Sequence, residues 1–178
     1  REDLQWDGTS SLFKKTILVY EEQGLGDIFQ FCRFIVVLEK MGANVKFYVD
    51  KRLHAILSTM SSNVVLVSEL PEKETIDYEM PIMSLPFYLK IHDYNALTKT
   101  PYLFADKEKT RVWSTQLNKK SFKIGICWQG SRKKIDVGRS FELSLFKNIS
   151  ELPNVELISL HKGDGETQLS DSSFKVTT

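Results

Sequence analysis

The sequence has 178 residues but only two cysteines and three histidines, and its formal net charge is +1. With no second Cys or His at ligand spacing, a zinc site and a disulfide framework are both disfavoured. The balanced charge provides no global field that would recruit nucleic acid or a membrane surface. No apolar run approaches the roughly 20 residues that cross a bilayer, and the charged start at 1–3 is unlike a signal peptide. We therefore expect a soluble, cytoplasmic protein without a metal ion.

The composition, 42% hydrophobic and 26% charged, is that of an ordinary globular protein. A length above the roughly 150 residues of an average domain favours one domain and part of another. The first residue is not Met, which suggests a longer parent protein. Cys32 and Cys127 both lie in apolar segments, so we interpret them as small buried hydrophobes in a reducing compartment.

Strand-like and helix-like segments alternate along the chain. Short apolar runs predict strands at 16–20, 45–49, 64–67, 76–80, 122–128 and 155–160. Helical spacing of apolar residues predicts helices at 27–41, 51–60, 84–89, 107–117 and 142–149. The alternation predicts an α/β fold, with a Rossmann-like parallel sheet and flanking helices over 1–118 and the first βαβ unit of a second Rossmann-like domain over 119–178. The polar residues from 163 onward are expected to fray.

The sharpest local feature is the segment Glu-Gln-Gly-Leu-Gly-Asp at 22–27, between the first strand and the first helix. Ligands of open α/β sheets bind beyond the carboxyl ends of strands, and Gly24 and Gly26 would let a substrate approach the backbone. Phosphate-loop motifs are absent, and Asp27 would repel a phosphate. Its carboxylate can accept a proton or a hydrogen bond from a hydroxyl, so Asp27 is a candidate general base. It is equally a candidate helix N-cap, and the two roles can coexist. Two further polar residues follow on the same flank of the helix: Gln30 and Arg33.

The second feature is electropositive. Between 119 and 139 seven basic residues accompany a single acid, Asp136: Lys119, Lys120, Lys123, Arg132, Lys133, Lys134 and Arg139. The segment leads from the end of a predicted strand to the start of a predicted helix, and its donors suit a diphosphate. A solvated charge run explains the same residues. Nucleic acid binding is disfavoured because aromatic residues are not interleaved with the basic ones.

Several short segments occur in a fixed order between about residues 6 and 162: Trp6–Gly8, Ile17–Val19, Glu22–Asp27, Gln30–Phe31, Arg33–Phe34, Ser84–Pro86, Pro101–Leu103, Lys123–Gly130 and Arg139–Ser140. This ordered set resembles glycosyltransferase-like domains that follow tetratricopeptide repeats, relatives of the ADP-heptose:lipopolysaccharide heptosyltransferases. The resemblance implies the GT-B architecture, in which two Rossmann-like domains face each other. It places the acceptor on the first domain and the nucleotide-sugar donor mainly on the second.

The resemblance implies an inverting, metal-independent transfer of a sugar to a hydroxyl of a glycan, lipid or protein acceptor. Asp27 would be the general base, and four residues would hold the donor's phosphates: Gln129, Gly130, Arg139 and Ser140. The nucleotide sugar is a co-substrate, so no cofactor is expected. The second domain stops after two predicted strands, and its unpaired edges favour homo-oligomers. The alternatives are a non-catalytic module that binds a sugar, a nucleotide or a partner protein, and a flavodoxin-like scaffold for an unrelated ligand.

Overall fold

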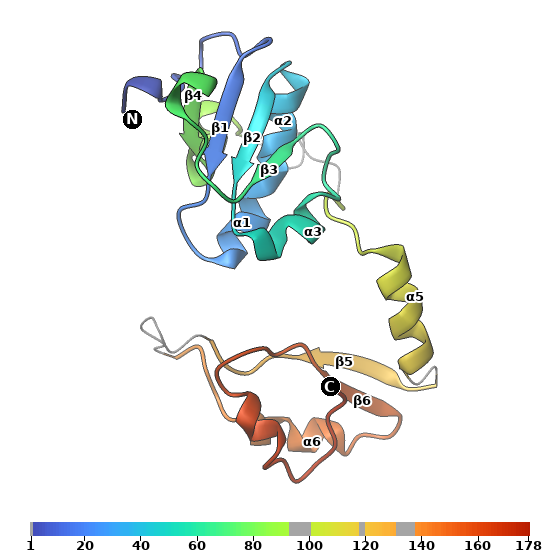
Figure 1. Cartoon of the computed structure of the whole chain (residues 1–178). Coiled ribbons are helices and arrows are strands. Elements are labelled where there is room, and N and C mark those ends of the chain that lie inside the picture. The colour runs from blue at the N-terminus through green and yellow to red at the C-terminus, as the bar shows by residue number, and fades with distance from the viewer. Residues whose placement is uncertain (1, 93–100, 118–119, 131–137) are drawn as a thin grey trace. The chain divides into compact units, whose positions relative to one another are not determined.

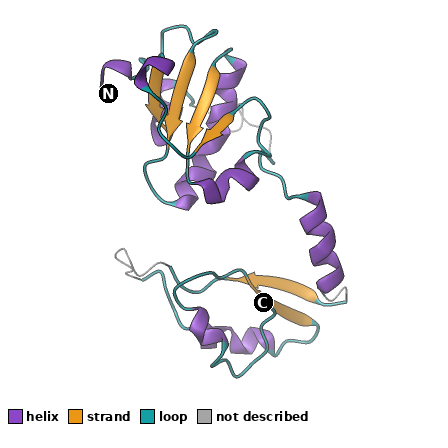
Figure 2. Ribbon diagram, in the orientation of Figure 1, coloured by secondary structure: helices purple, strands orange, loops and turns teal. Residues whose placement is uncertain are grey.

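The computed structural model describes residues 2–92, 101–117, 120–130 and 138–178. The chain divides into two compact units, Arg1–Thr110 and Arg111–Thr178. Buried apolar side chains form one cluster in the first unit and a smaller one in the second. Figure 1 and Figure 2 show the helices and strands of both units.

A parallel sheet forms the centre of the first unit (Figure 2). Its strands are β1 (Thr16–Tyr20), β2 (Asn44–Tyr48), β3 (Val65–Val67) and β4 (Tyr78–Pro81). They lie in the order β3-β2-β1-β4, and every neighbouring pair is parallel. The central strand buries Ile17, Leu18 and Val19 completely, as expected for a parallel strand that is covered on both faces. The predicted α/β fold with a parallel sheet and flanking helices is confirmed.

Short helices connect these strands. The α-helices of this unit are α1 (Leu25–Phe31), α2 (Ile35–Lys40), α3 (His54–Leu57) and α4 (Leu85–Tyr88). The 3₁₀-helices are η1 (Glu2–Leu4), η2 (Cys32–Phe34), η3 (Lys51–Leu53), η4 (Lys73–Thr75) and η5 (Ile82–Ser84). The predicted helix at 27–41 is therefore two α-helices joined by η2. It buries Ile28, Ile35 and Leu38 in the core with β1 and β2, and Figure 1 shows α1 and α2 on one side of the sheet.

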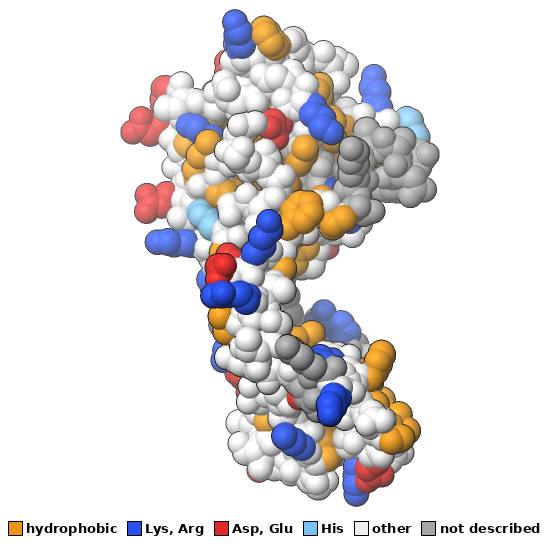
Figure 3. Space-filling model, turned by 90° about the vertical axis from the view of Figure 1, so that its right-hand side faces the viewer, with side chains coloured by type: hydrophobic (Ala, Val, Ile, Leu, Met, Phe, Trp, Pro, Cys, Tyr) orange, Lys and Arg blue, Asp and Glu red, His pale blue; other side chains and the backbone are white. Residues whose placement is uncertain are grey.

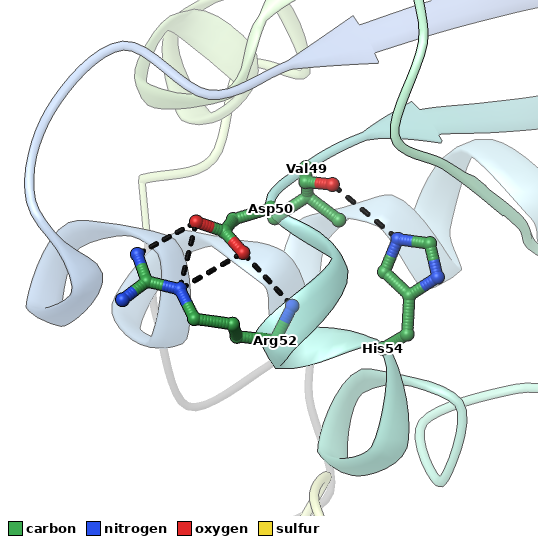
Figure 4. Close-up of polar contacts among 4 residues, drawn as sticks. All are labelled: Val49, Asp50, Arg52 and His54. Carbon is green, nitrogen blue, oxygen red and sulfur yellow. Dashed lines mark hydrogen bonds and ion pairs between the residues drawn. The ribbon is translucent and has the colours of Figure 1, made fainter.

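The turn between β2 and α3 is fixed by Asp50 (Figure 4). Its carboxylate accepts from the backbone N–H of Arg52 at 2.8 Å, which caps η3, and forms an ion pair with the same residue's guanidinium. One step further, His54 Nε2 lies 3.3 Å from the carbonyl oxygen of Val49. These local contacts hold the short helical segment directly after its strand.

The second unit is built around two parallel strands, β5 (Phe122–Ile126) and β6 (Val155–Ser159). Its helices are η7 (Leu143–Phe146), α6 (Lys147–Ser150) and η8 (Glu166–Leu169), and the division between the units falls within α5 (Lys107–Gln116). The predicted fraying after 163 is wrong. The Thr177 amide donates to the Leu157 carbonyl at 2.9 Å, and the Thr177 carbonyl accepts from the Ser159 amide at 2.8 Å. The tail is therefore held in place by pairing with the outer edge of β6.

Only one of the two cysteines is buried. Cys32 is fully buried in the first core, and this burial raises the pKa of its thiol to about 11. Cys127 is exposed, so the prediction that it is buried is wrong. Side chains alternate across an extended chain, and the buried neighbours Ile126 and Trp128 belong to the opposite face. The apolar flanks therefore did not bury the residue between them.

Candidate functional site

The strand β1 lies where the order of the sheet reverses. The chain places β2 and β3 on one side of β1 and then returns to place β4 on the other. Ligands of open parallel sheets bind beyond the carboxyl ends of strands at such a reversal. The segments that leave the two strands there are joined, since Glu22 Oε2 accepts from the backbone N–H of Met83 at 3.2 Å. This edge of the sheet is the candidate site.

Asp27 is the third residue of α1, and it closes the helix start with Gly24. The Gly24 amide donates to Asp27 Oδ2 at 3.1 Å, and the Asp27 amide donates to the Gly24 carbonyl at 3.1 Å. The N-cap is Gly24, so the interpretation of Asp27 as the N-cap is wrong. Its side chain is half-buried. Within the described residues no donor reaches the second carboxylate oxygen, Oδ1, which leaves that atom available to a ligand hydroxyl.

Neither glycine of the turn, Gly24 or Gly26, is needed for the backbone conformation or the packing of this segment. Neither has a positive φ. A Cβ on Gly26 would meet no atom within 4 Å, and one on Gly24 would meet only Asp27 Oδ2 at 3.7 Å. Both residues are exposed. The backbone in front of Asp27 is therefore bare, a property that permits close approach of another molecule.

The first unit has a pocket of about 570 Å³ whose lining includes two residues connected to this turn. Two of its lining residues provide the connection: Met83 is bonded to Glu22, and Phe31 lies four residues after Asp27, on the same face of α1. The pocket volume is in the range of small-molecule sites. Its wall also carries an exposed aromatic ring and two basic groups, from Phe87, Lys90 and His92.

The first segment of the family resemblance, Trp6–Gly8, contributes one residue, Asp7, to the lining of this pocket. Trp6 is buried. The Ser10 and Thr9 amides donate hydrogen bonds to the Asp7 carboxylate, and these bonds hold the pKa of Asp7 below its usual range. Gly8 has φ +76, and a Cβ there would lie 2.8 Å from the carbonyl oxygen of Tyr88. This glycine is required by the fold, unlike Gly26.

Arg33 contacts a distant segment of the first unit. Its Nη2 donates to the Tyr102 hydroxyl at 2.7 Å, and the guanidinium carbon lies 4.2 Å from the centre of that ring. The same hydroxyl donates to the Phe29 carbonyl at 2.9 Å. Arg33 Nε is buried and has no partner in the described part of the chain. Arg33 thus anchors Tyr102 to the helical segment, whereas Gln30 is exposed on α1.

The predicted donor turn lies in the second unit. The Gly130 amide donates to Ser140 Oγ at 2.9 Å, which holds the two ends of the turn together. Gln129 accepts from Gln168 Nε2 at 3.4 Å, while its own Nε2 is buried without a partner among the described residues. Arg139 is exposed. The fold therefore brings Gly130 and Ser140 into contact and leaves Arg139 on the surface beside them.

Much of the predicted basic run lies outside the described residues: Lys119, Arg132, Lys133, Lys134 and Asp136. Lys120 and Lys123 are exposed, and Lys123 Nζ donates to the Ser121 carbonyl at 3.0 Å. On the face drawn in Figure 3, Lys and Arg side chains are interspersed with acidic and apolar ones.

A thiol–imidazole pair in the second unit was missed by sequence reasoning. Cys127 Sγ and His161 Nδ1 lie 3.3 Å apart, although 34 residues separate them in the sequence. The available signal was that each follows one of two consecutive strands of a βαβ unit, whose carboxyl ends meet at one edge of the sheet.

Over the described ranges, no group of three or more His, Cys, Asp or Glu side chains is arranged to hold a metal ion. Within the same ranges, no helix has the length and apolar character needed to cross a membrane. Comparison of the chain with protein-family models, curated proteins and solved structures found no match.

Proposed function

We propose that this chain is a glycosyltransferase domain of the GT-B type, which transfers a sugar from a nucleotide-sugar donor to an acceptor hydroxyl. The observation that carries the proposal is the Asp27 carboxylate. It lies at the reversal of strand order, with one oxygen uncommitted among the described residues and a bare glycine backbone in front of it. The ordered resemblance of the segments supplies the reaction class.

In this reaction Asp27 acts as the general base. Its Oδ2 stays bonded to the Gly24 amide, and Oδ1 takes the proton from the acceptor hydroxyl. The acceptor oxygen then attacks the anomeric carbon as the bond from that carbon to the diphosphate breaks. The nucleoside diphosphate leaves with the electron pair, and the sugar is inverted at that carbon.

The pocket beside α1 is the proposed acceptor site. Phe31 and Phe87 offer apolar surface for a sugar ring, and Lys90 and His92 suit an anionic group on the acceptor. The turn at Gly130 and Ser140, with the cationic Arg139, would stabilise the negative charge that develops on the leaving diphosphate.

The test is the Asp27→Asn variant of the whole chain. Asparagine keeps an oxygen that can accept from the Gly24 amide, but it cannot take a proton. With a panel of nucleotide sugars and acceptors, release of nucleoside diphosphate should fall by roughly 100-fold or more in kcat, with the donor KM nearly unchanged. The matched control is Asp106→Asn, because Asp106 also accepts a backbone amide at a helix start, that of Lys109 at 2.8 Å.

Full turnover by Asp27→Asn would refute the role of the carboxylate. If the unmutated chain binds a nucleotide sugar in calorimetry but releases no product with any acceptor, the non-catalytic binding module is the correct description.

A further inference from the structure

Cys127 and His161 meet at one edge of the two-stranded sheet. Cys127 directly follows β5, and His161 comes two residues after β6. The strands are parallel and pair Ile126 with Ser159, so both residues lie at the carboxyl ends. There the thiol sulfur lies 3.3 Å from the imidazole Nδ1. This is where an α/β sheet usually carries its reactive groups.

The hydrogen-bond partners assign the proton positions of this pair. His161 Nε2 lies 2.6 Å from the carbonyl oxygen of Asp164. A carbonyl oxygen can only accept, so Nε2 carries the hydrogen. In the neutral ring Nδ1 then holds a lone pair and accepts the proton of the Cys127 thiol. Thiol, base and a group that orients the base are the parts of an activated cysteine nucleophile.

The imidazole is held in place from a second side. It stacks on the indole of Trp128, with ring centres 4.1 Å apart and an angle of 26° between the planes. His161 is only 7% exposed. Trp128 is itself fixed, because its Nε1 donates to the Gly165 carbonyl at 3.2 Å. The base is therefore oriented before any reagent arrives.

Cys127, in contrast, lies at the surface of the second unit. Cys127 is exposed, whereas Cys32 is buried in the first core. The chain thus contains one thiol that combines access with a neighbouring base and one that has neither, because the contact of Cys32 Sγ is with the Phe29 carbonyl at 3.4 Å. Thiol reactivity depends on both properties.

We propose that Cys127 is a covalent modification site whose thiol, activated by His161, reacts with hydroperoxides. His161 Nδ1 takes the thiol proton, and the sulfur attacks the terminal peroxide oxygen. The S–O bond forms as the O–O bond breaks, so the sulfur loses two electrons and becomes a sulfenic acid. The leaving hydroxide or alkoxide takes the proton from His161 and departs as water or an alcohol. This inference rests on the second unit alone and is independent of the proposed glycosyl transfer.

The test measures each cysteine separately by peptide mass spectrometry in the whole chain. Iodoacetamide reports the nucleophilicity of the thiol, and hydrogen peroxide followed by dimedone reports the sulfenic acid. A free cysteine is only a few per cent thiolate at pH 7, so activation can raise its rate up to about thirtyfold. We expect alkylation and dimedone labelling of Cys127 to be about tenfold slower in His161→Gln. His54→Gln is the control, because His54 also contacts a backbone carbonyl but lies in the first unit.

Equal rates at Cys127 in the unmutated chain and in His161→Gln would overturn the proposal. Rapid hydrogen exchange of the β5 and β6 amides, which pair with each other in the folded second unit, would reveal that this unit has unfolded in the variant. In that case the unmutated chain provides the comparison: Cys127 should be alkylated several-fold faster in the folded protein than in the urea-unfolded chain. An equal or slower rate in the folded protein would contradict activation.

Discussion

The carboxylate of Glu22 accepts a hydrogen bond from the backbone amide of Met83 at 3.2 Å. The bond joins the turn after β1 to the turn after β4, which are 61 residues apart in the sequence. The two turns meet because the chain crosses back over β1 to place β4, the last strand of this sheet, on its other side. The strand order therefore creates the candidate site, and this contact ties the turn that carries Asp27 to Met83, a residue that lines the pocket of the first unit.

Replacing Asp27 by alanine should weaken the start of α1. The variant loses the acceptor for the Gly24 amide, and such a loss costs about 1 kcal/mol of unfolding free energy. Urea denaturation followed by circular dichroism measures it. Gln30→Ala is the control, since Gln30 is exposed on the same helix, and its change should stay within about 0.5 kcal/mol. An equal loss in both variants would contradict the capping role.

Two glycines should respond to alanine in opposite directions. Gly8→Ala places a Cβ 2.8 Å from the Tyr88 carbonyl at a positive φ, and we expect a loss of about 2 kcal/mol or more in unfolding free energy. Gly26→Ala meets open space in a helix and should gain up to about 1 kcal/mol. If the proposed function holds, the stabilised Gly26→Ala variant nevertheless loses turnover, because the added methyl group obstructs the acceptor. Thermal unfolding and the diphosphate assay together measure both effects.

Tyr102→Phe should destabilise the first unit by about 1 to 2 kcal/mol. The hydroxyl accepts from Arg33 at 2.7 Å and donates to the Phe29 carbonyl at 2.9 Å, and its removal leaves a half-buried guanidinium without this acceptor. Tyr88→Phe is the matched control. Its hydroxyl accepts an exposed hydrogen bond from Gln5 at 2.9 Å, so we expect a loss of less than about 0.5 kcal/mol in unfolding free energy. A control as destabilised as Tyr102→Phe would indicate that loss of any tyrosine hydroxyl has this effect.

The stability of the first unit should decrease in acid because of Asp50. The Arg52 guanidinium and backbone amide lower the pKa of its carboxyl to about 2, against about 3.9 in an unfolded chain. A carboxyl with a lowered pKa in the fold stabilises above its unfolded pKa, and the contribution disappears as the pH falls towards the folded value. Unfolding measured from pH 5 to 2 should show this loss, and the slope should be smaller in Asp50→Asn. Glu74→Gln, which alters an exposed carboxyl, should keep the original slope.

The overall fold was predictable because its strongest signals are local. Ile17, Leu18 and Val19 of β1 are fully buried, as the apolar run there indicated. Gly42, which directly follows the predicted helix at 27–41, adopts φ +85 and donates to the Glu39 carbonyl at 2.9 Å, as is typical of a glycine at a helix end. The break of that segment into α1, η2 and α2 was not predictable, since apolar spacing alone does not distinguish an α-turn from a 3₁₀-turn.

The candidate site was predictable only where it depends on sequence neighbours. The strand-to-helix turn indicated the position of Asp27. The N-cap could not be predicted, because it is Gly24, a residue without a side chain that would mark it as a cap. The hydrogen-bond partner of the Arg33 guanidinium is Tyr102, which lies 69 residues away in the sequence. Cys127 and His161 are joined by the pairing of β5 with β6. Such partners are set by tertiary structure, and composition around each residue does not reveal them.

The pairing of Thr177 with Ile158 has a consequence for self-association. The final residues cover the outer rim of β6, whose amides and carbonyls would otherwise form a template for a strand from another molecule. A protease that clips this tail would uncover that template. The trimmed protein should then aggregate by edge-to-edge addition, while the intact chain resists it along this side.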